Sequence, residues 1–145
     1  MIATRGAEPL AEGGYAAAVL LDGAAMLSRE SLGALEDSLH AWEGAISLLR
    51  PTATAYLADV TGLPALAVTS GRYEQLLRHE LGERQKLKLP PATRIASISG
   101  PASLVSKARE ALEGTGAISD VLGPVETGSG VVRIIIRFSY AQGST

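Results

Sequence analysis

The sequence predicts an α/β chain in which a parallel sheet with its helices is followed by a small α+β sandwich. The apolar run at 15–22 shows no alternation, which is typical of a buried parallel strand. Over 31–49, apolar residues repeat at intervals of three and four, which predicts a helix packed on that sheet. After residue 94 the patterns run strand, helix, strand, strand, the order of a small α+β sandwich.

The N-terminal half contains the clearest helix. We expect a short strand and a loop over 1–14 before the buried strand. In the helix at 31–49, Ser31 is placed to cap the first turn, and Trp42 lies on the apolar stripe. We therefore expect Trp42 in the core and not as a platform for stacking bases. Arg50-Pro51 ends this helix; a strand at 54–60 and a short helix at 64–69 follow.

In the C-terminal half, a helix over 73–89 leads into Pro90-Pro91, and we expect the prolines to stop it and extend the chain. The last strand places Arg133 and Arg137 on one face and apolar residues on the other. The remaining predicted elements are a strand at 95–99, a helix at 101–113, a strand at 118–122, a loop at 126–130 and a final strand at 131–138.

Composition limits the functions that this chain can have. Its 145 residues allow one ordinary domain or two small ones, and 46% hydrophobic with 19% charged residues indicates a folded chain. The formal net charge of −2 gives no support for nucleic-acid binding, so that role would need a local basic patch. With no cysteine and two histidines, we expect no metal site.

Hydropathy and motif content also predict where the protein is located and whether it is an enzyme. No apolar run approaches the roughly 20 residues that span a bilayer, so we expect no membrane contact and a cytoplasmic protein. Both ends look cut, because the chain starts in a predicted strand and stops just past one. There is no G-x-x-x-x-G-K-[ST] phosphate loop, no Ser/His/Asp set and no paired carboxylates. We assign no catalytic residue and expect no enzyme complete in this chain.

Three motifs occur in order along the sequence. Residues 19–27 read V-L-L-D-G-A-A-M-L, and 121–125 read V-L-G-P-V. Between them, the pattern E-x-x-E-R-x-x-x-x-x-P-P is formed by Glu80, Glu83, Arg84, Pro90 and Pro91. In these motifs, and over nearly its whole length, the chain resembles the primosomal protein N′ family of replication restart helicases.

The resemblance implies two domains. Residues 1–89 would be the C-terminal part of the second, RecA-like helicase lobe, and 90–145 the start of the C-terminal α+β domain. It also implies a function in DNA replication: recognition of branched DNA at stalled forks, contact with single-stranded-DNA-binding protein, and reloading of the replicative helicase with other primosome proteins. Family members use ATP and Mg and bind zinc outside this region, which leaves no cofactor for this chain.

Two helicase motifs of the family depart from its pattern here. Thr4 lies where motif V would be, but Ala7 and Glu8 stand near the position of the family's Lys-Gly pair. The simpler interpretation of this stretch is a plain surface loop. Of the two arginines of motif VI, only one has a possible counterpart, Arg50. Because arginine fingers contribute on the order of 10³-fold or more to phosphoryl transfer, we expect no ATPase activity. Thr4 and Arg50 are then motif remnants.

One basic cluster stands out as a candidate for DNA binding. Arg84, Lys86, Lys88 and Arg94 lie close together in the sequence, with no acidic residue between the first and the last. Clustered lysines and arginines bind phosphates without reading sequence, because they release counterions from the nucleic acid. The alternative is that these cations solvate the end of a helix and complement its dipole.

Two other functions stay open. The chain could be a small α/β enzyme or ligand-binding domain of unknown specificity, or an interaction module that never contacts DNA. Binding of forked DNA and of the acidic tail of single-stranded-DNA-binding protein would separate the replication restart function from both.

Overall fold

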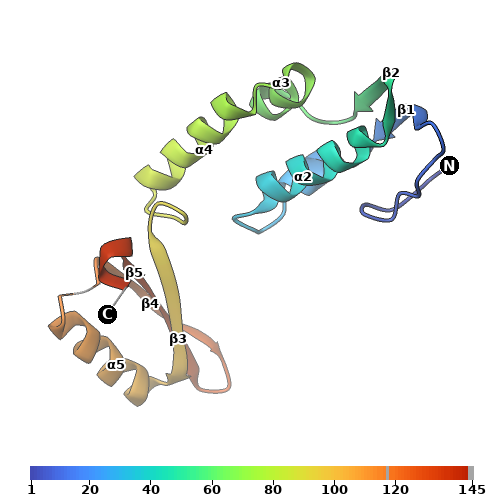
Figure 1. The fold of residues 1–145 in the computed structure, drawn as a ribbon. Helices are drawn as coiled ribbons and strands as arrows, with labels where there is room; N and C mark the ends of the chain where they lie inside the picture. Colours follow the sequence, from blue (N-terminus) through green and yellow to red (C-terminus); the bar gives the residue numbers. More distant parts are fainter. Residues whose placement is uncertain (117, 144–145) are drawn as a thin grey trace. The chain divides into compact units, whose positions relative to one another are not determined.

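The computed structural model describes residues 1–116 and 118–143. It divides into two compact units, Met1–Arg78 and His79–Thr145, called here the N-terminal and the C-terminal unit. The division falls inside one helix, α4 (Tyr73–Lys86). Each unit combines helices with a sheet, so the predicted α/β class is confirmed (Figure 1). The domain boundary at 89/90 stays a prediction.

The N-terminal unit is built on two parallel strands. Strand β1 pairs with β2, and Leu20 lies opposite Leu57 in the register. This parallel pairing confirms the prediction for the apolar run. The elements of this unit are β1 (Tyr15–Leu20), α1 (Gly23–Leu27), α2 (Ala34–Ser47), β2 (Leu49–Leu57), α3 (Gly62–Ser70) and the first turns of α4.

The core of this unit lies where its helices meet. Trp42 of α2 is only 2% exposed and clusters with Leu39, Ala67 of α3 and Leu76 of α4. The prediction that Trp42 belongs to the core is confirmed. Burying an aromatic ring of this size stabilises the unit by roughly 1.5–3 kcal/mol relative to leaving it exposed.

Two predictions for the start of the chain were wrong. Residues 1–14 contain no strand, and the side chain of Ile2 is fully exposed. Glycines with positive φ at Gly6, Gly13 and Gly14 turn this segment repeatedly, so it does not stay extended. Strand β1 is also less buried than predicted: Leu20 packs on the core, but Val19 on the other face is 61% exposed. In the described residues the sheet has helices against one face only.

Helix α2 is shorter at both ends than the predicted helix at 31–49. It begins at Ala34 with Gly33 as its N-cap, so Ser31 does not cap it. The Ser31 hydroxyl instead accepts a hydrogen bond from the backbone N–H of Gly33, a local turn that competes with the helix. At the other end, Arg50 and Pro51 belong to β2, which starts at Leu49 and not near 54. Proline is tolerated there, near the beginning of a strand.

The C-terminal unit is the predicted small α+β sandwich. Its three-stranded antiparallel sheet has the order β3-β5-β4, and α5 covers one face of it (Figure 1). Val105 of α5 packs with Ile134 and Ile136 of β5, while Arg133 points to the opposite, exposed face as predicted. The elements are β3 (Arg94–Pro101), α5 (Ala102–Gly114), β4 (Asp120–Gly128), β5 (Val131–Phe138) and a 3-10 turn η1 (Tyr140–Gly143).

Two boundaries in this unit differ from the prediction. Strand β4 runs on to Gly128, so the loop expected at 126–130 is a two-residue hairpin turn. Both turn residues, Ser129 and Gly130, have positive φ, as a type I′ turn requires. Helix α4 ends at Lys86, well before Pro90, so the proline pair does not stop it.

Candidate nucleic-acid interface

Helix α4 is closed by hydrogen bonds of its own backbone. The N–H of Lys88 donates to the carbonyl of Gln85, and the N–H of Leu89 donates to the carbonyl of Arg84. Lys88 itself adopts a left-handed backbone, with φ of 51°. Together these features form a Schellman motif, in which the left-handed residue after the helix is usually glycine. The helix therefore stops because of this turn, which presents a lysine where glycine is the easier residue.

Arg84 faces inward at the helix end. It is only 8% exposed, and its Nε donates to the Glu80 carboxylate at 2.8 Å. Its Nη1 also reaches the carbonyl of Pro90 at 3.4 Å, which ties the helix to the segment that follows. A guanidinium can hold a carboxylate and a carbonyl at once because its donors are fixed in a plane. In this geometry Arg84 stabilises the turn, and little of its side chain is accessible to a phosphate.

Lys86 is on the surface. Its side chain is 72% exposed and donates to the carboxylate of Glu83 at 2.6 Å. The hydrogen bond from Lys86, followed by its positive charge, lowers the pKa of Glu83. An exposed pair of this kind contributes little to stability, because water screens both charges. Lys86 can therefore exchange Glu83 for a phosphate at small cost.

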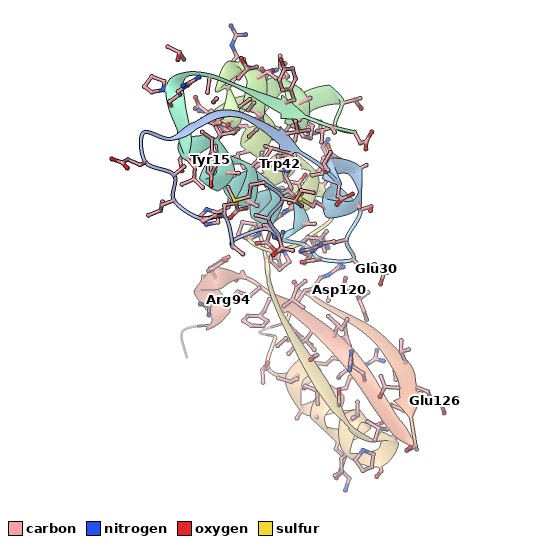
Figure 2. The ribbon with its side chains drawn as sticks, turned by 90° about the vertical axis from the view of Figure 1, so that its right-hand side faces the viewer. Tyr15, Glu30, Trp42, Arg94, Asp120 and Glu126 are labelled. Carbon is pink, nitrogen blue, oxygen red and sulfur yellow. The ribbon has the colours of Figure 1, made fainter. Side chains whose placement is uncertain are left out.

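Lys88 and Arg94 are also exposed. Arg94 is the first residue of β3, and its guanidinium carbon lies 5.1 Å from the centre of the Tyr140 ring, a cation–π contact. Figure 2 shows Arg94 and Asp120 towards one end of the sheet and Glu126 towards the other. Of the four predicted residues, the structure thus exposes Lys86, Lys88 and Arg94 and buries Arg84.

Charge is divided unevenly between the two units. The N-terminal unit has nine acidic and five basic residues, whereas the C-terminal unit has six acidic and eight basic. The net charge of −2 for the whole chain conceals this difference. A phosphate backbone would therefore be attracted to the C-terminal unit.

A second group of polar residues lies on the exposed face of the sheet, where the sequence predicted the two arginines but not their partners. Arg137 of β5 pairs with Asp120 of β4 at 3.3 Å, and Arg133 donates to the hydroxyl of Ser99 on β3. The alternation of β5 placed both arginines on this face, but only the strand register shows which residues lie beside them. These arginines are already engaged with neighbours of their own sheet.

The two motif remnants lie in the N-terminal unit. Thr4 is in the irregular segment before β1, where its carbonyl accepts from the N–H of Ala7. Arg50 is exposed near the beginning of β2. The backbone of Gly14 passes so close to Arg50 that a Cβ at Gly14 would lie 2.8 Å from the backbone nitrogen of Arg50. Glycine at position 14 is explained by this contact.

The described part of the chain holds no group of three or more His, Cys, Asp or Glu residues arranged to bind a metal ion. Nor does any helix among the described residues have the length and apolar character needed to cross a membrane.

Comparison with known proteins identifies the family. Residues 85–145 match the model of the primosomal protein N C-terminal domain. The chain is 37% identical, over 99% of its length, to "Probable replication restart protein PriA" of Mycobacterium tuberculosis (strain CDC 1551 / Oshkosh). The same figures hold for the protein of that name in Mycobacterium bovis (strain ATCC BAA-935 / AF2122/97). The chain belongs to the PriA family.

This assignment confirms the family resemblance drawn from the three sequence motifs. A PriA of Mycobacterium leprae (strain TN) is 34% identical over 92% of the chain. The chain spans only a quarter of the length of the Mycobacterium tuberculosis relative, so the match concerns one part of a PriA protein. The matched domain begins at residue 85 and includes the helix end with Lys86 and Lys88.

Proposed function

We propose that this PriA-family chain is a DNA-binding and scaffold part of a replication restart protein. In this proposal residues 1–89 are the back half of a RecA-like helicase lobe, and 90–145 begin the C-terminal domain. The chain contacts forked and single-stranded DNA and single-stranded-DNA-binding protein, and assists other primosome proteins without hydrolysing ATP. Support comes from its 37% identity to PriA proteins along 99% of its length.

The observation that argues most for DNA contact is the end of α4. Two exposed lysines, Lys86 and Lys88, lie two residues apart in the unit that has more basic than acidic residues. Lys88 occupies a left-handed position that glycine would fill with less strain. Strained residues are found preferentially at functional sites, and a cation is what a phosphate requires.

A phosphate contact here would be electrostatic and independent of sequence. Lysine is a compact point charge on a flexible stem, so Lys86 and Lys88 can follow a phosphate backbone without fixing a base. The C-terminal end of a helix carries partial negative charge, so α4 offers no dipole to an anion. Any attraction at this place must come from the lysines, and from Arg94 at the start of β3.

Charge reversal at these lysines tests the DNA proposal. We expect the chain to bind a labelled fork, measured by fluorescence anisotropy, and the variant Lys86→Glu with Lys88→Glu to bind it at least tenfold more weakly. The matched control reverses two exposed arginines of the N-terminal unit, Arg5→Glu with Arg29→Glu, which changes the net charge equally. Equal loss in both variants, or no loss in the lysine variant, would reject a local site.

The other parts of the proposal have separate tests. The acidic tail peptide of single-stranded-DNA-binding protein is expected to bind the chain, and no shift in a peptide titration would remove this partner. For the nucleotide, calorimetry with Mg-ATP is expected to give no binding tighter than about 100 μM, which corresponds to about 5.5 kcal/mol. Tighter binding would contradict the proposed loss of motifs V and VI.

A further inference from the structure

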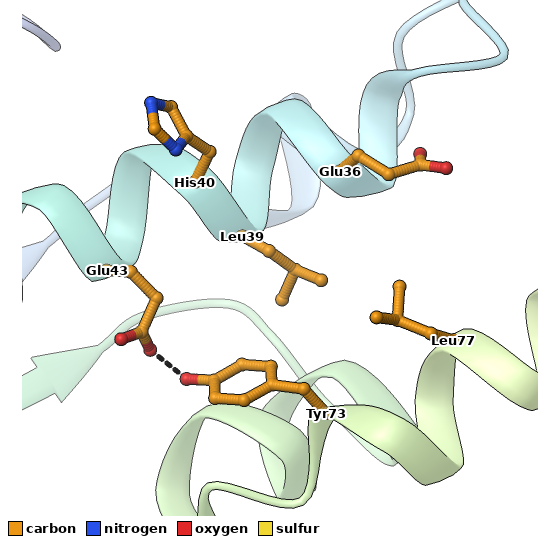
Figure 3. A pocket seen from close by; sticks show the side chains of 6 residues that line it. All are labelled: Glu36, Leu39, His40, Glu43, Tyr73 and Leu77. Atoms are coloured by element: carbon orange, nitrogen blue, oxygen red, sulfur yellow. Dashed lines mark hydrogen bonds between the residues drawn. The ribbon is translucent and has the colours of Figure 1, made fainter.

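A hollow lies between helices α2 and α4 within the N-terminal unit. Its volume is about 420 Å³, it is open to solvent, and residues of both helices line it. Figure 3 shows Leu39 of α2 and Leu77 of α4 pointing towards each other across it. Leu77 is 44% exposed and takes no part in the core cluster of this unit. The exposed apolar surface of the hollow is therefore that of Leu77, whereas Leu39 behind it is 7% exposed and belongs to the core cluster.

Carboxylates lie at both ends of the hollow. Glu36 lies at the end near Leu77, and Glu43 lies at the other, where its carboxylate accepts a hydrogen bond from the Tyr73 hydroxyl (Figure 3). That bond fixes the direction of the Glu43 side chain. The remaining lining residue, His40, points away from the gap between the helices.

The charge around the hollow is negative. The neighbouring cation on α4, Arg78, is held by Glu74 of the same helix at 2.6 Å, so its charge is compensated there. The N-terminal unit as a whole has nine acidic and five basic residues. Exposed apolar surface between two carboxylates is complementary to a partner that is apolar in the middle and basic at both sides.

We propose that the hollow between α2 and α4 binds a basic amphipathic helix of a partner protein. Glu36 and Glu43 are seven residues apart, two helical turns, which is a rise of about 10.5 Å. A helix lying along α2 meets both carboxylates when its own lysines or arginines are seven residues apart. Apolar side chains three and four positions after the first of these cations then rest on the exposed Leu77, as in other helix-in-groove complexes.

The proposed helical partner is distinct from DNA, and its binding does not involve the basic end of α4. A DNA phosphate would be repelled by Glu36 and Glu43, so the two proposals concern ligands of opposite charge. Failure of one leaves the other standing.

Selection from a displayed library of helical peptides tests the proposal. The library has randomised positions on one helix face, and the probe is the complete 145-residue chain. We expect enriched peptides to carry lysine or arginine seven residues apart around leucine, isoleucine or valine. A synthetic peptide of the enriched sequence is then titrated by fluorescence anisotropy. We expect Leu77→Ser and Glu36→Lys each to weaken its binding by about tenfold, which is the effect of losing a central contact.

Matched variants make the test specific. Leu66 on α3 is 45% exposed and Glu30 is an exposed acid, and neither lines the hollow. Leu66→Ser and Glu30→Lys are expected to leave binding unchanged, with circular dichroism showing that all four variants fold. Enrichment of no peptide, enrichment of peptides without the basic pair, or equal binding by Leu77→Ser would overturn the proposal. Sedimentation showing a dimer that Leu77→Ser dissociates would also overturn it, because the occupant would be a second copy.

Discussion

At Lys88 the backbone conformation favours glycine, whereas the proposed DNA contact requires a lysine. Its left-handed backbone costs a non-glycine residue on the order of 1–2 kcal/mol, yet glycine there would close the Schellman motif equally well. The lysine is exposed, so packing does not explain it. We propose that a phosphate contact, which needs positive charge at this turn, is the reason for the lysine.

Replacing this lysine by glycine separates stability from binding. We expect Lys88→Gly to keep or raise the free energy of unfolding, by up to about 1 kcal/mol, because it removes the left-handed strain. The same variant is expected to bind forked DNA more weakly. Urea denaturation and anisotropy measure the two effects, and Lys86→Gln provides a charge-removing control that leaves the backbone unchanged. A stability loss in Lys88→Gly would show that the lysine side chain holds the turn.

The pKa of Glu83 indicates whether the Lys86 ammonium group lies beside its carboxylate. Because Lys86 lowers the pKa of Glu83, this carboxylate stays ionised to a lower pH than an isolated glutamate. The favourable pairing is present above the pKa of Glu83 in the unfolded chain and is lost as the pH falls through the lowered value. We expect Lys86→Gln to raise the pKa of Glu83 in a carbon-detected NMR titration.

Forked DNA should have the same effect on Glu83 in the unaltered chain. If a phosphate takes Lys86 away from Glu83, the pKa of Glu83 rises and the complex takes up protons near that pH. A pKa of Glu83 that is unchanged in saturating DNA would mean that Lys86 keeps its intramolecular partner in the complex.

In strand β4, the backbone geometry explains why the motif V-L-G-P-V contains a glycine. Gly123 of V-L-G-P-V has φ of 100° and lies at an irregularity in the pairing of β4 with β5. A Cβ at this position would lie 2.8 Å from the carbonyl oxygen of Arg133. Only glycine satisfies both the backbone angle and this close approach.

A second glycine of the same strand offers a matched control. Gly128 has a similar φ of 108° but has no atom within 4 Å of a Cβ built there. Gly123→Ala is expected to lower the free energy of unfolding by about 1–3 kcal/mol more than Gly128→Ala, because overpacking adds to the same backbone strain. Denaturation of the two variants checks this, and equal losses would mean that β4 shifts to make room.

Periodicity alone predicted most of the elements, but not their ends. The apolar stripe identified Trp42 as core, and the alternation of 131–138 identified the two faces of β5. The ends depended on local hydrogen bonds: a Ser31 turn shortens α2, and a Schellman motif ends α4 before the prolines. Such bonds compete with helix formation over single residues, which a pattern of several turns does not resolve.

The four cations of the candidate site were chosen by their clustering in the sequence, and their function in binding stays a prediction. Clustering in the sequence found all four cations, but the burial of Arg84 depends on Glu80 and on the Pro90 carbonyl, contacts that spacing does not reveal. The left-handed backbone of Lys88 was equally hidden, since lysine gives no signal for positive φ. The hollow between α2 and α4 was not predicted, because it requires two helices that are distant in sequence to pack together.

At the scale of the whole molecule, the two units differ in the sign of their charge. The acidic excess lies in Met1–Arg78 and the basic excess in His79–Thr145. We expect DNA to perturb the C-terminal unit and a basic peptide to perturb the N-terminal unit. Amide chemical shifts in the two titrations check this division, which fails if both ligands perturb the same residues.

The salt dependence of DNA affinity shows whether Lys86 and Lys88 bind phosphates. Each phosphate contact contributes roughly 0.7 to 0.9 to the slope of log affinity against log salt concentration. For fork and single-stranded DNA alike, we expect a slope smaller by about 1.4 to 1.8 in Lys86→Glu with Lys88→Glu than in the unaltered chain. The control Arg5→Glu with Arg29→Glu should keep the original slope. An unchanged slope in the lysine variant would mean that Lys86 and Lys88 bind no phosphate and only complement the helix dipole.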